Sequence, residues 1–206
     1  MDRIVLHSFR RCPFAIRVRM VLEEKQIPYL LLEENLRHFS AELLALHPEG
    51  KVPLLVHHFE GSKQVVFQST IITEYLDETF PKSPLMPKDP VSRVQVRLWT
   101  HWCDYIFKPD LDLFKYKLSN LTEVQITDLV SRLHTHFAKW EKQLTDSPFL
   151  FSGPMTLADV HLFPFARQFF SIKQSEEWAV NYPKVYGWLG RIVARPSFQR
   201  VMSKTE

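Results

Sequence analysis

Residues 4–22 read IVLHSFRRCPFAIRVRMVL, and this stretch decides the fold of the first part of the chain. It opens on a short β-branched run at residues 4–6, which predicts a strand. From Pro13 onward the apolar residues recur at helical spacing, which predicts a helix. The stretch therefore predicts a strand, a loop and a helix, with Cys12 at the start of the helix.

The segments that follow extend this start into an α/β domain. Residues 29–32 predict a second strand, and a connection through a helix makes it parallel to the first. Residues 52–56 and 65–67 flank a turn, which predicts a hairpin. Short helical or irregular structure is expected around residues 40–46, and Ser69 can cap a further helix. The predicted order is βαβαββα.

A proline-rich stretch separates this domain from the rest of the chain. Residues 80–90 hold four prolines, a composition that continues neither a helix nor a strand. Beyond it the apolar residues follow helical periods, and Thr156 with Asp159 approximates a capping box. We expect an α/β domain over residues 1–79, a linker over 80–90 and an all-α helical bundle over 91–206.

Composition narrows the class of protein. The formal net charge is only +3 over 206 residues, and the basic residues are scattered, which argues against nucleic-acid binding. The first apolar run is too short for a signal peptide, and no stretch is long enough to span a bilayer. We therefore expect a cytoplasmic protein with neither a nucleic-acid nor a membrane partner. The cysteine and histidine spacing matches no metal-ligand pattern, so no metal site is expected.

Cys12 is the residue on which the functional hypothesis depends. If Pro13 is the first helical residue, Cys12 is the N-cap, and its sulfur faces free backbone N–H groups and the positive end of the helix dipole. That placement lowers the pKa of a thiol. The alternative is a small buried hydrophobe, as most free cysteines are, although a loop position disfavours burial. Cys103, beside Trp102 in an apolar helical segment, is expected to be inert core. Additional positive potential near Cys12 in sequence comes from Arg10, Arg11, Arg17 and Arg19.

The thiol that completes a reaction at Cys12 is expected to come from solution. Ala15 stands where a Cys-x-x-Cys motif would place its resolving cysteine. In the cytoplasm the natural candidate is glutathione, which would form a mixed disulfide with Cys12 and be released by a second glutathione.

Two further positions suit a peptide-like ligand. A cis bond between Val52 and Pro53 would let Val52 offer its N–H and C=O to such a ligand, while a trans proline at the start of a strand is an equal alternative. Gln68 and Ser69 at a helix start suit a ligand carboxylate, although Ser69 taken singly is more often only a cap.

These motifs together resemble the cytosolic glutathione transferase family, most closely its cysteine-type omega-like branch. In chain order the matching residues are 12–15 with Arg17 and Arg19, Pro48, 50–53, Gln68 and Ser69, 74–78, Phe80 and Pro81, Trp102 and 156–159. The resemblance implies a thioredoxin-like first domain that holds glutathione, an all-helical second domain and a homodimer.

The same resemblance assigns roles within the first domain. Cys12 would form the mixed disulfide and Phe14 would pack by the thiol. Val52 with a cis Pro53 would pair with the cysteinyl backbone of glutathione, and Ser69 would bind the γ-glutamyl carboxylate.

The chain departs from the family pattern at two positions. Gln68 stands where the family usually has Glu, and a neutral amide cannot pair with the γ-glutamyl ammonium. Phe39 stands where the closest branch often has a lysine for the glycine carboxylate, a role that Lys51 or Arg37 would take over.

The second substrate is expected to be a small electrophile or a disulfide. For any one of the candidate residues, ordinary packing between helices is a commoner role than lining the pocket of this substrate. Candidates to line its pocket are Trp99, Trp102, Tyr105 and Arg167.

The leading hypothesis is a glutathione-dependent thiol transferase or reductase. Two alternatives stay open. One is a transferase that conjugates glutathione to an electrophile with Cys12 as a hydrogen-bond donor. The other is a non-catalytic interaction protein on the same scaffold.

Overall fold

The computed structural model describes residues 3–47, 49–145 and 147–204, so Pro48 lies outside the described residues. Two compact units share them: Met1–Pro84 together with Arg195–Glu206, and Leu85–Ala194. We call these the first unit and the second unit.

The first unit is built on a four-stranded sheet with the order β2-β1-β3-β4. The central strand β1 (Arg3–Ser8) pairs in parallel with β2 (Tyr29–Glu33) and antiparallel with β3 (Leu54–Phe59), with Val5 opposite Leu30 and Val56. The edge strand β4 (Ser62–Phe67) completes the predicted hairpin with β3. All four predicted strands are therefore present.

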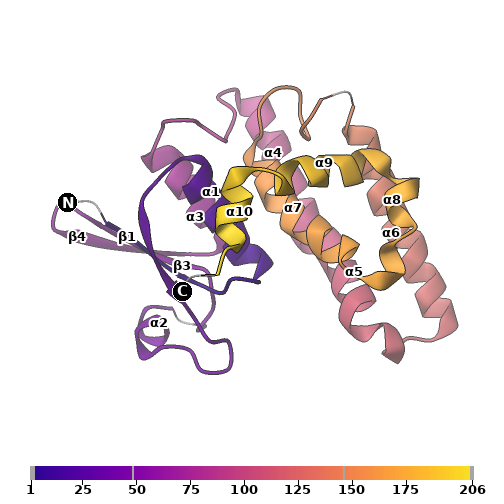
Figure 1. Cartoon of the computed structure of the whole chain (residues 1–206), viewed down its shortest axis with the longest axis horizontal. Helices are drawn as coiled ribbons and strands as arrows, with labels where there is room; N and C mark the ends of the chain where they lie inside the picture. Colours follow the sequence, from indigo (N-terminus) through magenta and orange to yellow (C-terminus); the bar gives the residue numbers. More distant parts are fainter. Residues whose placement is uncertain (1–2, 48, 146, 205–206) are drawn as a thin grey trace. The chain divides into compact units, whose positions relative to one another are not determined.

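Helices cover both faces of this sheet (Figure 1). The short α2 (Ala41–Leu46) packs Leu43 against Val5, Leu54 and Val56 on one face. Because neighbouring residues of a strand point to opposite faces, the buried Leu6 faces the other side, where α1 (Pro13–Glu24) and α3 (Ser69–Thr79) lie.

The C-terminal helix α10 (Pro196–Met202) belongs to the first unit, whereas the helical periods of the sequence predict residues 91–206 as one helical bundle. It packs along α1, because its apolar residues Phe198 and Val201 are buried there and its flanking Arg195 pairs with Glu24 of α1. The division between the units falls after Pro84, inside the predicted linker.

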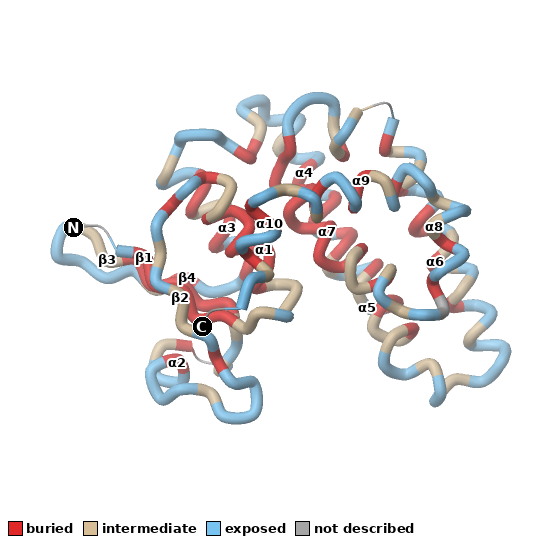
Figure 2. Tube along the Cα trace, viewed as in Figure 1, coloured by how far each residue is buried: buried red, intermediate tan, exposed pale blue. Residues whose placement is uncertain are grey.

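The second unit is all-helical in class, because its described residues form helices joined by loops and include no strand. Its main helices are α4 (Pro90–Trp102), α5 (Lys108–Asp112), α6 (Glu123–Gln143), α7 (Leu157–Phe170), α8 (Trp178–Asn181) and α9 (Pro183–Val193). Two π-helical turns, η1 (Cys103–Phe107) and η2 (Leu113–Lys117), flank α5, and two 3₁₀ turns, η3 (Leu118–Asn120) and η4 (Lys173–Ser175), complete the set. Figure 2 shows α7 buried along most of its length.

The predicted capping box opens α7. Asp159 accepts hydrogen bonds from the backbone N–H and the hydroxyl of Thr156, at 2.8 and 3.0 Å. The same carboxylate also accepts from the N–H of Leu150 and from Nε1 of Trp188, both at 2.8 Å. Asp159 therefore joins three segments of the second unit as well as capping a helix.

The predicted fold class is confirmed, with a thioredoxin-like α/β part and a helical part. None of the helices in the described part of the chain combines the length and the apolar character that crossing a bilayer requires.

Candidate thiol site

Cys12 lies at the N-cap of α1, as the sequence predicts. Its backbone is extended, with φ −72° and ψ 119°, and Pro13 is the first helical residue. The Cys12 N–H donates to the carbonyl of Phe9, and the Cys12 carbonyl accepts from the N–H of Ile16, both at 2.9 Å. The thiol is half-buried, whereas Cys103 is fully buried within the second unit.

The pKa of the Cys12 thiol is raised, and the predicted lowering is wrong in its net sign. Burial raises this pKa and is the largest effect. The N–H groups of Ala15 and Phe14 and the charges of Arg19 and Arg17 lower it, as expected of a helix start in a basic region, but they do not outweigh burial. The thiol is therefore mostly protonated at neutral pH.

Arg17 links the thiol helix to the start of α3. Its side chain is completely buried, and its Cζ lies 5.2 Å from the centre of the Phe14 ring. Its Nη1 donates to the Oγ of Ser69 at 3.3 Å. Phe14 and Ser69, which the sequence predicts in one glutathione site, thus contact the same guanidinium group.

The start of α3 has an unusual backbone. Gln68 is the N-cap and has φ +71°, a left-handed value that is uncommon for a residue other than glycine. Ser69 is the first helical residue, so the expectation that it caps the helix is corrected by one position. Strained residues of this kind cluster at ligand sites. The Gln68 side chain is exposed, and Ser69 is buried.

The segment before β3 adopts the cis alternative. The Val52–Pro53 peptide bond is cis, Pro53 is buried, and Val52 packs against the cluster beneath α2. Gly50 precedes them with φ +56°, and a Cβ at this position would lie 2.9 Å from Leu44 Cδ2. The positive φ favours glycine here, whereas the close contact is only with the flexible end of the exposed Leu44 side chain.

The candidates for the glycine carboxylate of glutathione have different surroundings. Lys51 is exposed and forms an ion pair with Glu49, a contact that costs little to exchange for a ligand. Arg37 is also exposed, and its N–H donates to Asn35. Phe39 packs against the same apolar cluster as Val52, which explains an aromatic residue at that position.

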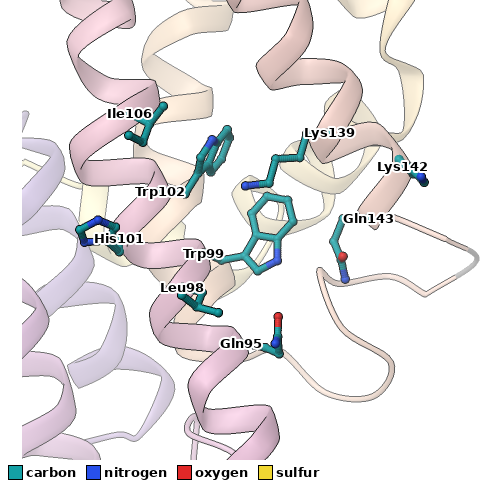
Figure 3. Close-up of a pocket in the computed structure, with 9 residues that line it drawn as sticks. All are labelled: Gln95, Leu98, Trp99, His101, Trp102, Ile106, Lys139, Lys142 and Gln143. Atoms are coloured by element: carbon teal, nitrogen blue, oxygen red, sulfur yellow. The ribbon is translucent and has the colours of Figure 1, made fainter.

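A cavity of about 760 Å³ lies in the second unit between α4, η1 and α6. Figure 3 shows Trp99 and Trp102 on its wall, and Lys139 reaching over them from α6. The Nζ of Lys139 is 4.6 Å from the Trp99 ring centre and 4.4 Å from that of Trp102. Burial lowers the pKa of Lys139. The other lining residues are Gln95, Leu98, His101, Ile106, Lys142 and Gln143.

The structure brings together two of the four predicted second-substrate residues at this cavity. Trp99 and Trp102 line it, and Tyr105 stacks on the lining residue His101 at 4.6 Å. Arg167 lies on α7, outside the set of described residues that line the cavity. Lys139 was not predicted. In the sequence it is a single lysine on a helix, and nothing in the local pattern distinguishes it from a lysine that points into solvent.

Two family models match the chain. The glutathione S-transferase N-terminal domain matches residues 11–79, and the glutathione S-transferase C-terminal domain matches residues 123–191. Glutathione S-transferase 3 of Glycine max is 32% identical over 205 residues, which cover 98% of this chain and 90% of that protein. The chain belongs to the glutathione S-transferase family.

Solved glutathione transferases of two classes share the fold. A tau-class enzyme from mango, Mangifera indica, superposes with a TM-score of 0.85 at 25% identity, over 98% of this chain and 94% of its own. Glutathione transferase Omega 3C of Trametes versicolor superposes with a TM-score of 0.84 at 22% identity, over 98% of this chain and 90% of its own. The predicted family is confirmed, and the fold does not single out the omega-like branch within it.

Proposed function

We propose that this member of the family is a glutathione-dependent thiol transferase of the omega-like type, in which Cys12 forms a mixed disulfide with glutathione. The observation that carries the proposal is a half-buried cysteine at the N-cap of α1, within the part of the chain that matches the N-terminal domain of the family. A cysteine at this position can form a disulfide, which a hydroxyl group cannot.

The proposed reaction is a double thiol–disulfide exchange. The Cys12 thiolate attacks the glutathione sulfur of a glutathionylated disulfide substrate, the S–S bond breaks, the substrate leaves as a thiolate that takes up a proton, and Cys12 is joined to glutathione. A second glutathione thiolate attacks the glutathione sulfur of this mixed disulfide and releases oxidised glutathione with the Cys12 thiolate. The raised pKa of Cys12 reduces its thiolate fraction, but a thiolate of higher pKa is the stronger nucleophile.

The start of α3 would hold one end of glutathione. Ser69, hydrogen-bonded to the buried Arg17, would bind the γ-glutamyl carboxylate near the positive end of the helix dipole. Gln68 would hydrogen-bond the γ-glutamyl end without compensating its ammonium charge.

The segment before β3 would hold the rest of the tripeptide. Val52 would pair with the cysteinyl backbone beside Pro53, Lys51 would take the glycine carboxylate, and Phe14 would pack by the thiol. The cytoplasmic location and the homodimer that the resemblance implies are part of the same proposal.

The second substrate, a small electrophile or disulfide, is proposed to use the cavity of the second unit. Trp99 and Trp102 offer flat apolar walls, and Lys139 adds a positive charge above them. Tyr105 and Arg167 stay proposed as contributors.

A second candidate function is the conjugation of glutathione to an electrophile. The raised pKa of Cys12 favours it, because a protonated thiol can donate a hydrogen bond to the glutathione thiolate while that thiolate attacks. The similarity to a tau-class enzyme supports the same reading.

One set of variants separates these two functions. Glutathione-dependent reduction of hydroxyethyl disulfide and conjugation of chlorodinitrobenzene are measured for wild type, Cys12→Ser, Cys12→Ala and the matched control Cys103→Ser. We expect both Cys12 variants to lose the reductase activity, Cys103→Ser to keep it, and Cys12→Ser to gain conjugating activity. Reduction that survives in Cys12→Ser would overturn the thiol-transferase proposal, and conjugation that falls in that variant would favour the second candidate.

A further inference from the structure

The loop that leads into Cys12 is held through Arg10 at three points. The Arg10 N–H donates to Oε1 of Glu33, at the end of β2, over 2.6 Å. The Arg10 carbonyl accepts from Nη2 of Arg19. The Arg10 guanidinium donates from Nη1 to the carbonyl of Met202, at the end of α10, over 3.3 Å.

Arg19 joins this loop to the C-terminal helix. Its side chain is 1% exposed, and its Nη1 donates to the carbonyl of Val201 in α10 over 2.9 Å. The Nε of Arg19 is buried and has no hydrogen-bond partner among the described residues. The guanidinium group of Arg19 therefore donates to two carbonyls, that of Arg10 in the loop before Cys12 and that of Val201 in α10.

The helix α10 is itself fastened to α1. Arg195 donates from Nε and Nη2 to the two carboxylate oxygens of Glu24, both at 2.7 Å. Arg200 donates from Nε to Glu23 over 2.6 Å, and Phe198 lies buried between the two anchors in the sequence. Figure 1 shows α10 beside α1, the helix that Cys12 caps and that carries Arg19.

The position of the Arg19 charge affects the pKa of the Cys12 thiol. The positive charges of Arg19 and Arg17, both on α1, act on Cys12 and lower the pKa of its thiol. Arg19 in turn interacts electrostatically with Glu33 and Tyr29 of β2 and with Arg10 of the loop. A shift of the Arg19 guanidinium would change the field at the sulfur, because the effect of a charge depends on its distance.

We propose that α10 is a positioning element of the thiol site: the Val201 carbonyl orients Arg19, and Arg19 with Arg10 fixes the loop that presents Cys12. Arg19 is then a positioning residue, and the C-terminal helix acts on the thiol without touching it. The inference extends the proposed function, but it concerns the reactivity of Cys12 and does not require glutathione to be the substrate.

The first test measures how fast Cys12 is alkylated by iodoacetamide as a function of pH, in the full chain carrying Cys103→Ser so that a single thiol reacts. Arg19→Gln should move the midpoint of the profile upward by about one unit, since a nearby opposite charge shifts a pKa by roughly one to three. Arg19→Lys keeps the charge and should move the midpoint by less than half as much. Arg3→Gln, at an exposed arginine of β1, is the matched control and should leave the midpoint unchanged.

The second test perturbs α10 at a distance from the thiol. Phe198→Ala should speed hydrogen exchange in α10 and shift the Cys12 midpoint in the same direction as Arg19→Gln. Combined with Arg19→Gln it should add no further shift, because both changes act through one contact. If Phe198→Ala does not fold, Arg195→Gln, which breaks the ion pair between Arg195 and Glu24, replaces it in this test.

Two results would overturn the inference. One is an alkylation midpoint of Arg19→Gln equal to that of wild type. The other is a Phe198→Ala variant in which the amide hydrogens of α10 exchange rapidly while the pH midpoint of Cys12 alkylation stays at the wild-type value. Neither result bears on the mixed disulfide with glutathione, which is measured separately, so this inference and the proposed function can fail independently.

Discussion

Arg17 donates a hydrogen bond to the hydroxyl of Ser69 over 3.3 Å, and this bond joins the helix that presents the thiol to the helix whose start is proposed to bind glutathione. Arg17 is completely buried, so its charge is poorly screened by water. A carboxylate bound at Ser69 would therefore lie beside a positive charge as well as at a helix N-terminus. The two halves of the candidate site are linked by a single guanidinium group.

Replacing Ser69 with alanine should weaken glutathione binding by roughly ten- to a hundredfold. A hydrogen bond to a charged group contributes roughly 1.5–3 kcal/mol, and 1.4 kcal/mol corresponds to a factor of ten. Isothermal titration calorimetry measures the change in Kd. Ser92→Ala, in the first turn of α4, is the matched control and should bind as wild type does. A Kd for Ser69→Ala within a factor of two of wild type would remove Ser69 from the binding site.

Replacing Gln68 with glutamate should strengthen glutathione binding several-fold. The carboxylate would pair with the γ-glutamyl ammonium that a neutral amide leaves uncompensated, and the gain should shrink at high salt. Titrations at two ionic strengths measure both effects. An unchanged affinity at low salt would show that the γ-glutamyl ammonium lies elsewhere.

Local signals in the sequence were sufficient to predict the position of Cys12. Pro13 fixes the backbone of a first helical residue and needs no N–H partner, so Cys12 before it becomes the N-cap. The strands, the hairpin and the capping box at Thr156 and Asp159 were predicted for the same reason, because short-range pattern and geometry determine each of them.

Features that depend on long-range packing were not predicted. The helical period of residues 196–202 indicates which face of α10 is apolar, but not which unit buries that face. The sign of the Cys12 pKa shift depends on desolvation, which exists only in the folded chain. Lys139 lies over two indoles because α4 and α6 line the same cavity in the folded chain, and no local pattern encodes that contact.

Replacing Glu24 with glutamine should destabilise the first unit at neutral pH. Burial raises the pKa of Glu24, but hydrogen bonds from Arg195 and Ser197 prevail and lower it below its ordinary value of 4.5. The stabilisation from Glu24 is therefore complete above pH 4.5 and is lost as the pH falls through the lowered pKa. We expect the free energy of unfolding to drop by about 1–2 kcal/mol at pH 7.

Urea unfolding at several pH values tests this expectation. The difference between wild type and Glu24→Gln should narrow as the pH falls below 4.5, whereas the exposed Glu42→Gln serves as a control with little effect at any pH. A difference that stays constant down to acid pH would mean that the Glu24 charge contributes nothing to stability.

Replacing Asp159 with alanine should destabilise the second unit by about 3–5 kcal/mol. The change leaves the buried N–H groups of Thr156, Leu150 and Trp188 without their acceptor, and each unsatisfied buried donor costs roughly 1–3 kcal/mol. Thr156→Ser, which keeps the hydroxyl bonded to Asp159, should cost less than 1 kcal/mol. Chemical denaturation of both variants gives the comparison, and a loss below 1 kcal/mol for Asp159→Ala would contradict a joining role for this carboxylate.

The mass of the intact protein after incubation with oxidised glutathione tests the central claim most directly. We predict one glutathione per chain on wild type and on Cys103→Ser, removed by a reducing agent and missing from Cys12→Ala. An adduct-free wild type, or an equal adduct on Cys12→Ala, would contradict the claim that Cys12 is the thiol that exchanges with glutathione.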